Sequence, residues 1–109
     1  MKIEIPFSAE MARTVLENRK FCTSRNKKYG QVGDTFEVED QGPWIPAFGG
    51  FEIVAIVKRP LWFVACCYHL AEGFDNQGGF VKMWEKLHPK KGWEPEKEVW
   101  VHWFIRVAP

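Results

Sequence analysis

Four stretches of the chain have the pattern of strands, in which side chains alternate between two faces, although the third stretch alternates only at its start and is then continuously apolar. They cover residues 2–7, 29–39, 51–59 and 98–108. In the second stretch a Gly-Asp pair indicates a turn that precedes the strand. The third stretch is rich in β-branched residues and ends at a proline. We therefore predict four strands.

Three other segments fit helices. Ser8 is the expected N-cap of a helix from residue 9 to about residue 18. Residues 61–74 are apolar almost all round, which is typical of a helix that is buried or meets a partner, and Gly73 is expected to close it. Residues 78–89 carry apolar side chains at i, i+3, i+4 and i+7, which predicts an amphipathic helix.

The order of these elements is strand, helix, strands, two helices and strand, without repeats or a long linker. This order predicts one α+β domain over residues 1–109. We expect a small mixed, mostly antiparallel β-barrel with about three covering helices.

Composition allows a packed core and limits the class of ligand that the chain can bind. The chain has 109 residues, of which 46% are apolar, and its formal net charge is +1. Because the whole molecule is not a polycation, any nucleic-acid binding must come from a local patch, and residues 19–28 are the clearest one. The near-neutral charge favours a short or single-nucleotide ligand over a long nucleic-acid track.

Cysteine usage and hydropathy predict a cytoplasmic protein. Three cysteines, two of them adjacent at Cys66 and Cys67, make a poor disulfide framework, so reduced thiols are expected. His69 follows this pair, but no second ligand pair stands at suitable spacing, so neither a metal nor another cofactor is expected. The N-terminus lacks the apolar run of a signal peptide, and the longest apolar run is about half of the ~20 residues of a spanning helix. No membrane association is expected.

The stretch RKFCTSR gathers three cations, one thiol and two hydroxyls within residues 19–25. Crowded like charges cost free energy unless an anion lies nearby. Three interpretations stay open: a solvated basic loop, an anion or RNA site without chemistry, and a hydrolytic site.

The motifs of this chain are similar to those of the ASCH domain in the PUA-like superfamily. The family pattern has Lys, then Thr three positions on, then Arg two further, then a Gly-Asp turn and later Glu-Gly-Phe. Here these are Lys20, Thr23, Arg25, the pair at 33–34 and the triplet at 72–74. The resemblance covers essentially the whole chain, although many members have Gly where this chain has Arg before the motif Lys.

The resemblance implies a small β-barrel with a cleft between barrel and helices that takes RNA or modified nucleosides. Some bacterial members are amidohydrolases that remove the acetyl group of N(4)-acetylcytidine, with the motif Lys as base, Thr as nucleophile and Glu as proton donor. Another is described as a ribonuclease. Carried over by position, this nominates Lys20, Thr23 and Glu72 as catalytic residues, with Arg25 beside them.

The residues themselves set conditions on that chemistry. A Thr hydroxyl needs a base, and Lys20 can serve only in its neutral form, which nearby cations favour. In an extended segment Thr23 and Lys20 point to opposite faces, so they meet only if the chain turns between them. Cys22 is intrinsically more nucleophilic but points away from Thr23 and ranks second.

Glu72 has two interpretations. Placed just before Gly73, it would face the negative end of a helix dipole, which disfavours a carboxylate by roughly 0.3–1 kcal/mol and suits a proton donor. Alternatively, it pairs with Arg25 or Lys20. A pair with Lys20 would oppose the base role of that amine.

Three functions follow. The first is an RNA- or nucleoside-binding domain in which cations hold phosphate or a base carbonyl and an aromatic ring in a Pro/Gly loop stacks on a base. The predicted ligand-binding residues are Arg19, Arg25, Lys27, Lys28 and Trp44. The second is a hydrolase, an amidohydrolase before a ribonuclease, using Lys20, Thr23 and Glu72, with Arg25 stabilising the oxyanion. The third is a protein-interaction module, such as a homodimer, through the apolar helix at 61–70.

Overall fold

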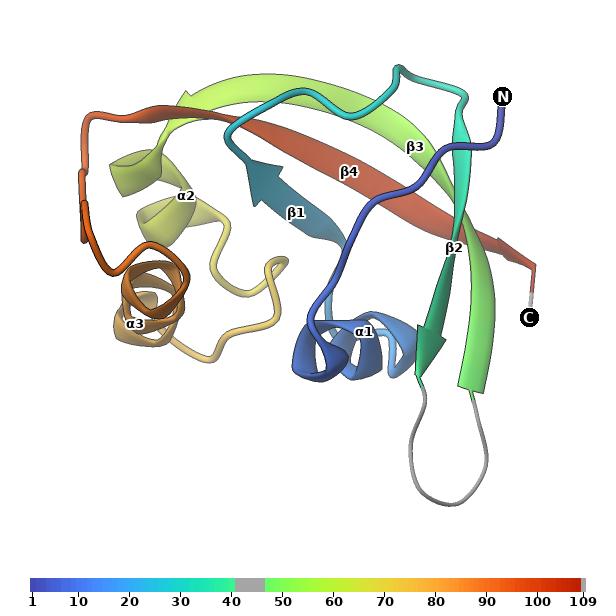
Figure 1. Cartoon of the computed structure of the whole chain (residues 1–109), viewed down its shortest axis with the longest axis horizontal. Helices are drawn as coiled ribbons and strands as arrows, with labels where there is room; N and C mark the ends of the chain where they lie inside the picture. Colours follow the sequence, from blue (N-terminus) through green and yellow to red (C-terminus); the bar gives the residue numbers. More distant parts are fainter. Residues whose placement is uncertain (41–46, 109) are drawn as a thin grey trace.

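The structure, a computed structural model, describes residues 1–40 and 47–108. It is α+β, as predicted, with one antiparallel sheet in the order β1-β4-β3-β2 and three helices (Figure 1). The elements in chain order are α1 (Ala9–Leu16), β1 (Cys22–Arg25), β2 (Thr35–Asp40), β3 (Ala47–Pro60), α2 (Leu61–Cys67), α3 (Gln77–Leu87) and β4 (Glu98–Ala108).

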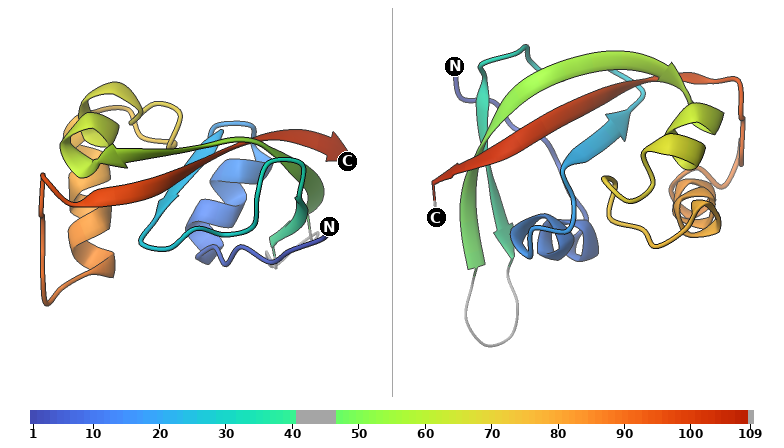
Figure 2. Two further views of the ribbon diagram at one scale, coloured as in Figure 1. Left: turned by 90° about the horizontal axis from the view of Figure 1, so that it is seen from above. Right: turned by 180° about the vertical axis from the view of Figure 1, so that it is seen from behind.

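The long strands β3 and β4 cross the whole molecule, and the sheet curls into a half-barrel around α1 (Figures 1 and 2). Helices α2 and α3 lie together at the other end of these strands (Figure 2). Register shifts at Gly50/Phe51 and Ile53/Ala55 interrupt the β3–β4 ladder, and irregularities of this kind bend and twist a strand. The curled sheet therefore presents two differently covered faces.

The two faces of β4 contribute to two separate cores. Phe104 belongs to the first core, whereas Val99 and Val101, an odd number of positions away, belong to the second. Because neighbouring side chains on a strand point to opposite faces, this division follows from the alternation itself. Strand β4 therefore carries apolar side chains on both of its faces.

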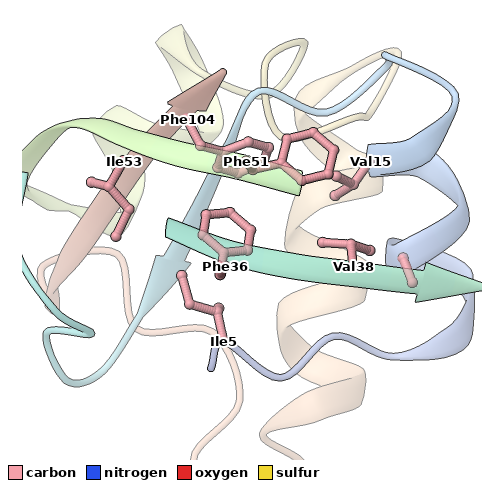
Figure 3. Close-up of a cluster of buried hydrophobic side chains, with 8 residues drawn as sticks. Ile5, Val15, Phe36, Val38, Phe51, Ile53 and Phe104 are labelled. Atoms are coloured by element: carbon pink, nitrogen blue, oxygen red, sulfur yellow. The ribbon is translucent and has the colours of Figure 1, made fainter. Parts of the chain in front are cut away.

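The first core fills the inside of the curl, where aromatic rings from three strands pack against α1 (Figure 3). Phe36, Phe51 and Phe104 have ring centroids 5.3–5.6 Å apart. The buried members are Ile5, Ala12, Val15, Phe36, Val38, Phe51, Ile53 and Phe104. The second core joins α2 and α3 to the other face of the sheet. Its buried members are Cys22, Leu61, Val64, Ala65, Phe80, Trp84, Val99 and Val101.

Helix α1 is capped as the sequence predicts. The Ser8 side chain accepts a hydrogen bond from the Met11 backbone N–H. The helix ends at Leu16, and Asn18 adopts a left-handed conformation with φ of 61°. The strand predicted at residues 2–7 is wrong, because this segment makes only an isolated bridge between Lys2 and Thr35.

The helix predicted over residues 61–74 is too long. Helix α2 ends at Cys67, and residues 68–73 form turns. The carbonyl of Ala71 accepts hydrogen bonds from the backbone N–H groups of Phe21 and Cys22, at 2.7 and 3.2 Å, so it ties the turn to the start of β1. The short helix α2 buries one face and leaves Trp62 exposed on the other. A homodimer that forms through the exposed face of α2 stays a prediction.

None of the helices within residues 1–40 and 47–108 has the length and apolar character needed to cross a membrane.

Candidate functional site

A cavity of about 460 Å³ opens between α1, the segment around β1, and α3. Its apolar wall comes from the two helices and consists of Met11, Met83, Trp84 and Leu87. Its polar wall comes mostly from the segment around β1 and consists of Lys20, Ser24, Arg25, Asn26 and Lys27. Tyr29 and His88 complete the lining, and the His88 ring stacks on Trp84 at 4.1 Å between centroids.

Lys20 and Glu72, 52 positions apart, form a buried ion pair beside this cavity. Lys20 Nζ lies 2.8 Å from Glu72 Oε1 and also donates to the Glu72 backbone carbonyl at 3.1 Å. The second carboxylate oxygen, Oε2, accepts a 2.6 Å hydrogen bond from the Ser24 hydroxyl. The side chains of Lys20 and Glu72 are only 2% and 1% exposed, so solvent screens this pair very little.

The turn after α2 brings Glu72 to this place. Gly73 has φ of +99°, and a Cβ there would lie 2.7 Å from the Thr14 side chain of α1. Only glycine therefore fits the close approach of the turn to α1. The helix-dipole interpretation of Glu72 is wrong, because α2 ends five residues earlier.

Thr23 lies on the other face of β1. It pairs with His102 of β4, whereas Ser24 pairs with Val101, and paired residues on adjacent strands share a face. Thr23 is buried but is not among the residues that line the cavity. The predicted catalytic trio is thus brought together only for Lys20 and Glu72, and Ser24 occupies the third position at the carboxylate.

Arg25 lines the cavity, and one of its donors is buried and, among the described residues, unpaired. Its Nη2 donates to the Pro6 carbonyl at 2.6 Å, and its guanidinium lies 5.1 Å from the centre of the Phe7 ring. Its Nε is buried and, within the described part of the chain, has no hydrogen-bond partner. Burial lowers the pKa of Arg25, while the Glu72 and Tyr29 side chains oppose that shift.

The remaining predicted ligand-binding residues divide. Lys27 lines the cavity and lies 4.8 Å from the centre of the Tyr29 ring. Lys28 instead lies 5.9 Å from the centre of the Trp100 ring. Arg19 is exposed beside Glu17 and does not line the cavity. Trp44 lies outside the described residues.

Sequence reasoning did not select Ser24, Trp84, His88 or His102 as site residues. The helical spacing of Trp84 and His88 on α3 placed both on one side of that helix, yet the spacing alone does not distinguish a core face from a cavity wall. His102 is fully buried: its Nε2 accepts from the Tyr29 backbone N–H at 2.9 Å, and its Nδ1 lies 3.3 Å from the Thr23 carbonyl. It thereby holds the loop that follows β1.

Cys22 faces the same side as Glu72 but is not a reactive thiol. Burial raises its pKa well above the usual range, the Glu72 carboxylate raises it further, and Lys20 only partly offsets both. A thiol that stays protonated is a weak nucleophile. No group of three or more histidine, cysteine or acidic side chains in residues 1–40 and 47–108 is placed to hold a metal ion.

The fold of this chain, a curled antiparallel sheet with three helices over the described residues, is similar to that of two solved structures. The solved ASCH domain from Lactobacillus crispatus JV V101 superposes with a TM-score of 0.69 and 13% identity, over 99% of this chain and 79% of that one. A DUF984 family protein from Enterococcus faecalis V583 superposes with a TM-score of 0.67 and 17% identity, over 98% and 78%. The resemblance to an ASCH domain is confirmed as a likeness of fold.

No family model and no curated protein matches the sequence.

Proposed function

We propose that the cavity binds one unstacked base, either in RNA or as a free modified nucleoside. Its volume of about 460 Å³ lies within the roughly 300–1,000 Å³ of small-molecule sites. Aromatic and apolar side chains form one wall and hydrogen-bonding groups the other. A nucleoside has the same two-sided character, with a flat apolar face and polar edges.

The observation that carries this proposal is the guanidinium-bearing side chain of Arg25 in the polar wall of the cavity, beside Lys27. A guanidinium presents several N–H donors in a planar fork, which suits a phosphate oxygen or a base carbonyl. Lys27, at the rim, is placed to meet a phosphate or ribose oxygen. The ASCH-type fold agrees with RNA as a ligand.

The test is a titration with cytidine, N(4)-acetylcytidine and a pyrimidine hexanucleotide, followed by the change in tryptophan fluorescence. Trp84 lies in the cavity wall, so a stacked base should alter its emission. Arg25→Lys should weaken binding by at least tenfold, whereas Arg19→Lys, an exposed matched control, should not. Equal effects of the two substitutions, or no binding of any of the three ligands, would refute the proposal.

A second candidate is an amidohydrolase that removes an acyl group from such a nucleoside. The observation in its favour is the buried contact of Glu72 with Lys20 and with a hydroxyl that lines the cavity. Lys20 donates both of its observed hydrogen bonds, so the geometry supports a role for the ammonium in holding charge rather than in accepting a proton. Acetate release from N(4)-acetylcytidine, lost in Glu72→Gln, is the test.

A further inference from the structure

Three side chains form one line of hydrogen bonds that ends at the cavity. It runs from Lys20 Nζ to Glu72 Oε1, and from Glu72 Oε2 to Ser24 Oγ, over 2.8 and 2.6 Å. All three residues are at least nine-tenths buried, yet Lys20 and Ser24 also line the cavity. The line connects a buried charged pair to a hydroxyl in the cavity wall.

The distance between Ser24 and Glu72 is that of a charge-assisted bond. Hydroxyl-to-carboxylate bonds of about 2.5–2.7 Å are the short, strong class. In this bond the hydroxyl hydrogen points at the carboxylate, so a lone pair of Ser24 Oγ is directed elsewhere. A hydroxyl with its proton held by a carboxylate is the geometry of an activated nucleophile and its base.

Neighbouring nucleophiles do not share this geometry. Thr23 follows the opposite face of β1 and pairs with His102. Cys22 is fully buried, and the causes that raise the pKa of its thiol keep it protonated. Ser24 is the hydroxyl of β1 that combines contact with Glu72 and access to the cavity.

We infer that Ser24 is the nucleophile of an acyl-transfer site formed with Glu72 and Lys20 in the cavity wall. This inference rests on the hydrolytic form of the proposed function. Ser24 Oγ forms a bond to the acyl carbonyl carbon, and its proton moves to Glu72 Oε2. The same carboxyl then gives this proton to the leaving amine as the C–N bond breaks, which leaves an acyl ester on Ser24.

Water completes the cycle. A water molecule attacks the ester carbonyl while Glu72 takes its proton, and the proton returns to Ser24 Oγ as the carboxylic acid leaves. Lys20 stays an ammonium throughout and stabilises the negative charge of the Glu72 carboxylate. Arg25, whose side chain lines the cavity, would hold the oxygen of the substrate carbonyl.

The first measurement does not depend on knowing the substrate. The protein is incubated with an alkyl fluorophosphonate, which forms an O–P bond with an activated serine and releases fluoride, with the proton again taken by Glu72. Intact mass shows whether one label is added, and peptide mapping shows where. We expect one label on Ser24, its loss in Ser24→Ala, and retention in Thr23→Val, which keeps the β-branched shape.

Peptide mapping on the unaltered protein keeps the test decisive if Ser24→Ala does not fold. No label on the unaltered protein, or a label on Thr23, would overturn the assignment. Ser24→Thr, which keeps a hydroxyl, should label at least tenfold more slowly than the unaltered protein but at the same residue.

Acetate release from N(4)-acetylcytidine then tests the proposed substrate separately from the assignment of Ser24 as the nucleophile. A labelled Ser24 without acetate release supports the nucleophile and refutes that substrate. Acetate release that survives Ser24→Ala and is abolished in Thr23→Val refutes the nucleophile and supports the substrate.

Discussion

The ion pair between Lys20 and Glu72 should be one of the most costly single contacts to break in this domain. In Lys20→Met the side chain keeps its length but loses its charge, and the Glu72 carboxylate stays 1% exposed with one remaining side-chain donor, Ser24. Removing one partner of a buried pair typically costs about 3–5 kcal/mol, because the other charge is left uncompensated. A domain of this size is stable by about 5–15 kcal/mol in total, so the loss is a large fraction.

The assay is urea unfolding followed by tryptophan fluorescence, for Lys20→Met, Glu72→Gln and the double variant. Because each single variant leaves the other member of the pair buried without its partner, and the double variant leaves neither charge, the double variant should be more stable than the sum of the two losses predicts, by about 0.5–3 kcal/mol. In thermal unfolding, Lys20→Met should lower the melting temperature by about 12–20 °C, because each kcal/mol corresponds to about 4 °C in a domain of this size.

An exposed pair in the same chain is the matched control. Lys2 Nζ lies 2.6 Å from Glu37 Oε1, closer than in the buried pair, but the two side chains are 63% and 46% exposed. Surface pairs contribute about 0–1 kcal/mol, so Lys2→Met should have little effect. A loss in Lys20→Met no larger than in Lys2→Met would refute the reasoning, since it would mean that solvent reaches the pair.

Three further outcomes are expected. Burial lowers the pKa of His102 below its ordinary 6.5, so the stability that the neutral ring contributes should be complete above pH 6.5 and fall as the pH drops below it. His102→Gln should reduce this dependence of the urea midpoint on pH. A urea midpoint that stays constant between pH 7 and 5 would contradict the expectation. Gly73→Ala should lower the free energy of unfolding in urea by about 1–3 kcal/mol. Gly92→Ala should cost less, because Gly92 also has a positive φ but has open space around it. Equal losses would contradict the steric argument. In the folded protein a thiol reagent should modify the two exposed cysteines and spare Cys22; rapid modification of all three would contradict its burial.

Periodicity predicted the elements whose two sides meet different surroundings. Helix α1, helix α3 and strand β4 have polar and apolar positions at regular spacing, so their presence could be read from the sequence. The end of α2 could not, because residues 61–74 are apolar almost all round and carry no stripe whose loss marks an end. It is set instead by a tertiary contact, the hydrogen bonds from Phe21 and Cys22 to the Ala71 carbonyl.

The site was predicted only in part for a related reason. The order of motifs selected Lys20 and Glu72, and the alternative interpretation, in which these two form an ion pair, is what the structure shows. The apolar wall was not selected, since a tryptophan that lines a cavity and one that fills a core have the same spacing. Trp84 is both, since it is a buried member of the second core and also lines the cavity. Its place at the cavity depends on the position of β1, which lies about 60 residues away along the chain.

The choice of nucleophile shows where two kinds of sequence argument diverge. Position in the family pattern assigns Thr23, whereas strand alternation puts Lys20 and Ser24 on one face and Thr23 on the other. The structure follows the alternation, because β1 is held in register by β4 on one side and by the carbonyl of Ala71 before it. A shift of β1 by one residue would bring Thr23 to the Glu72 carboxylate in place of Ser24. The same shift would move Cys22 out of the core. The chain therefore cannot bring Thr23 to Glu72 without losing buried contacts, and this is the physical reason to test Ser24 first.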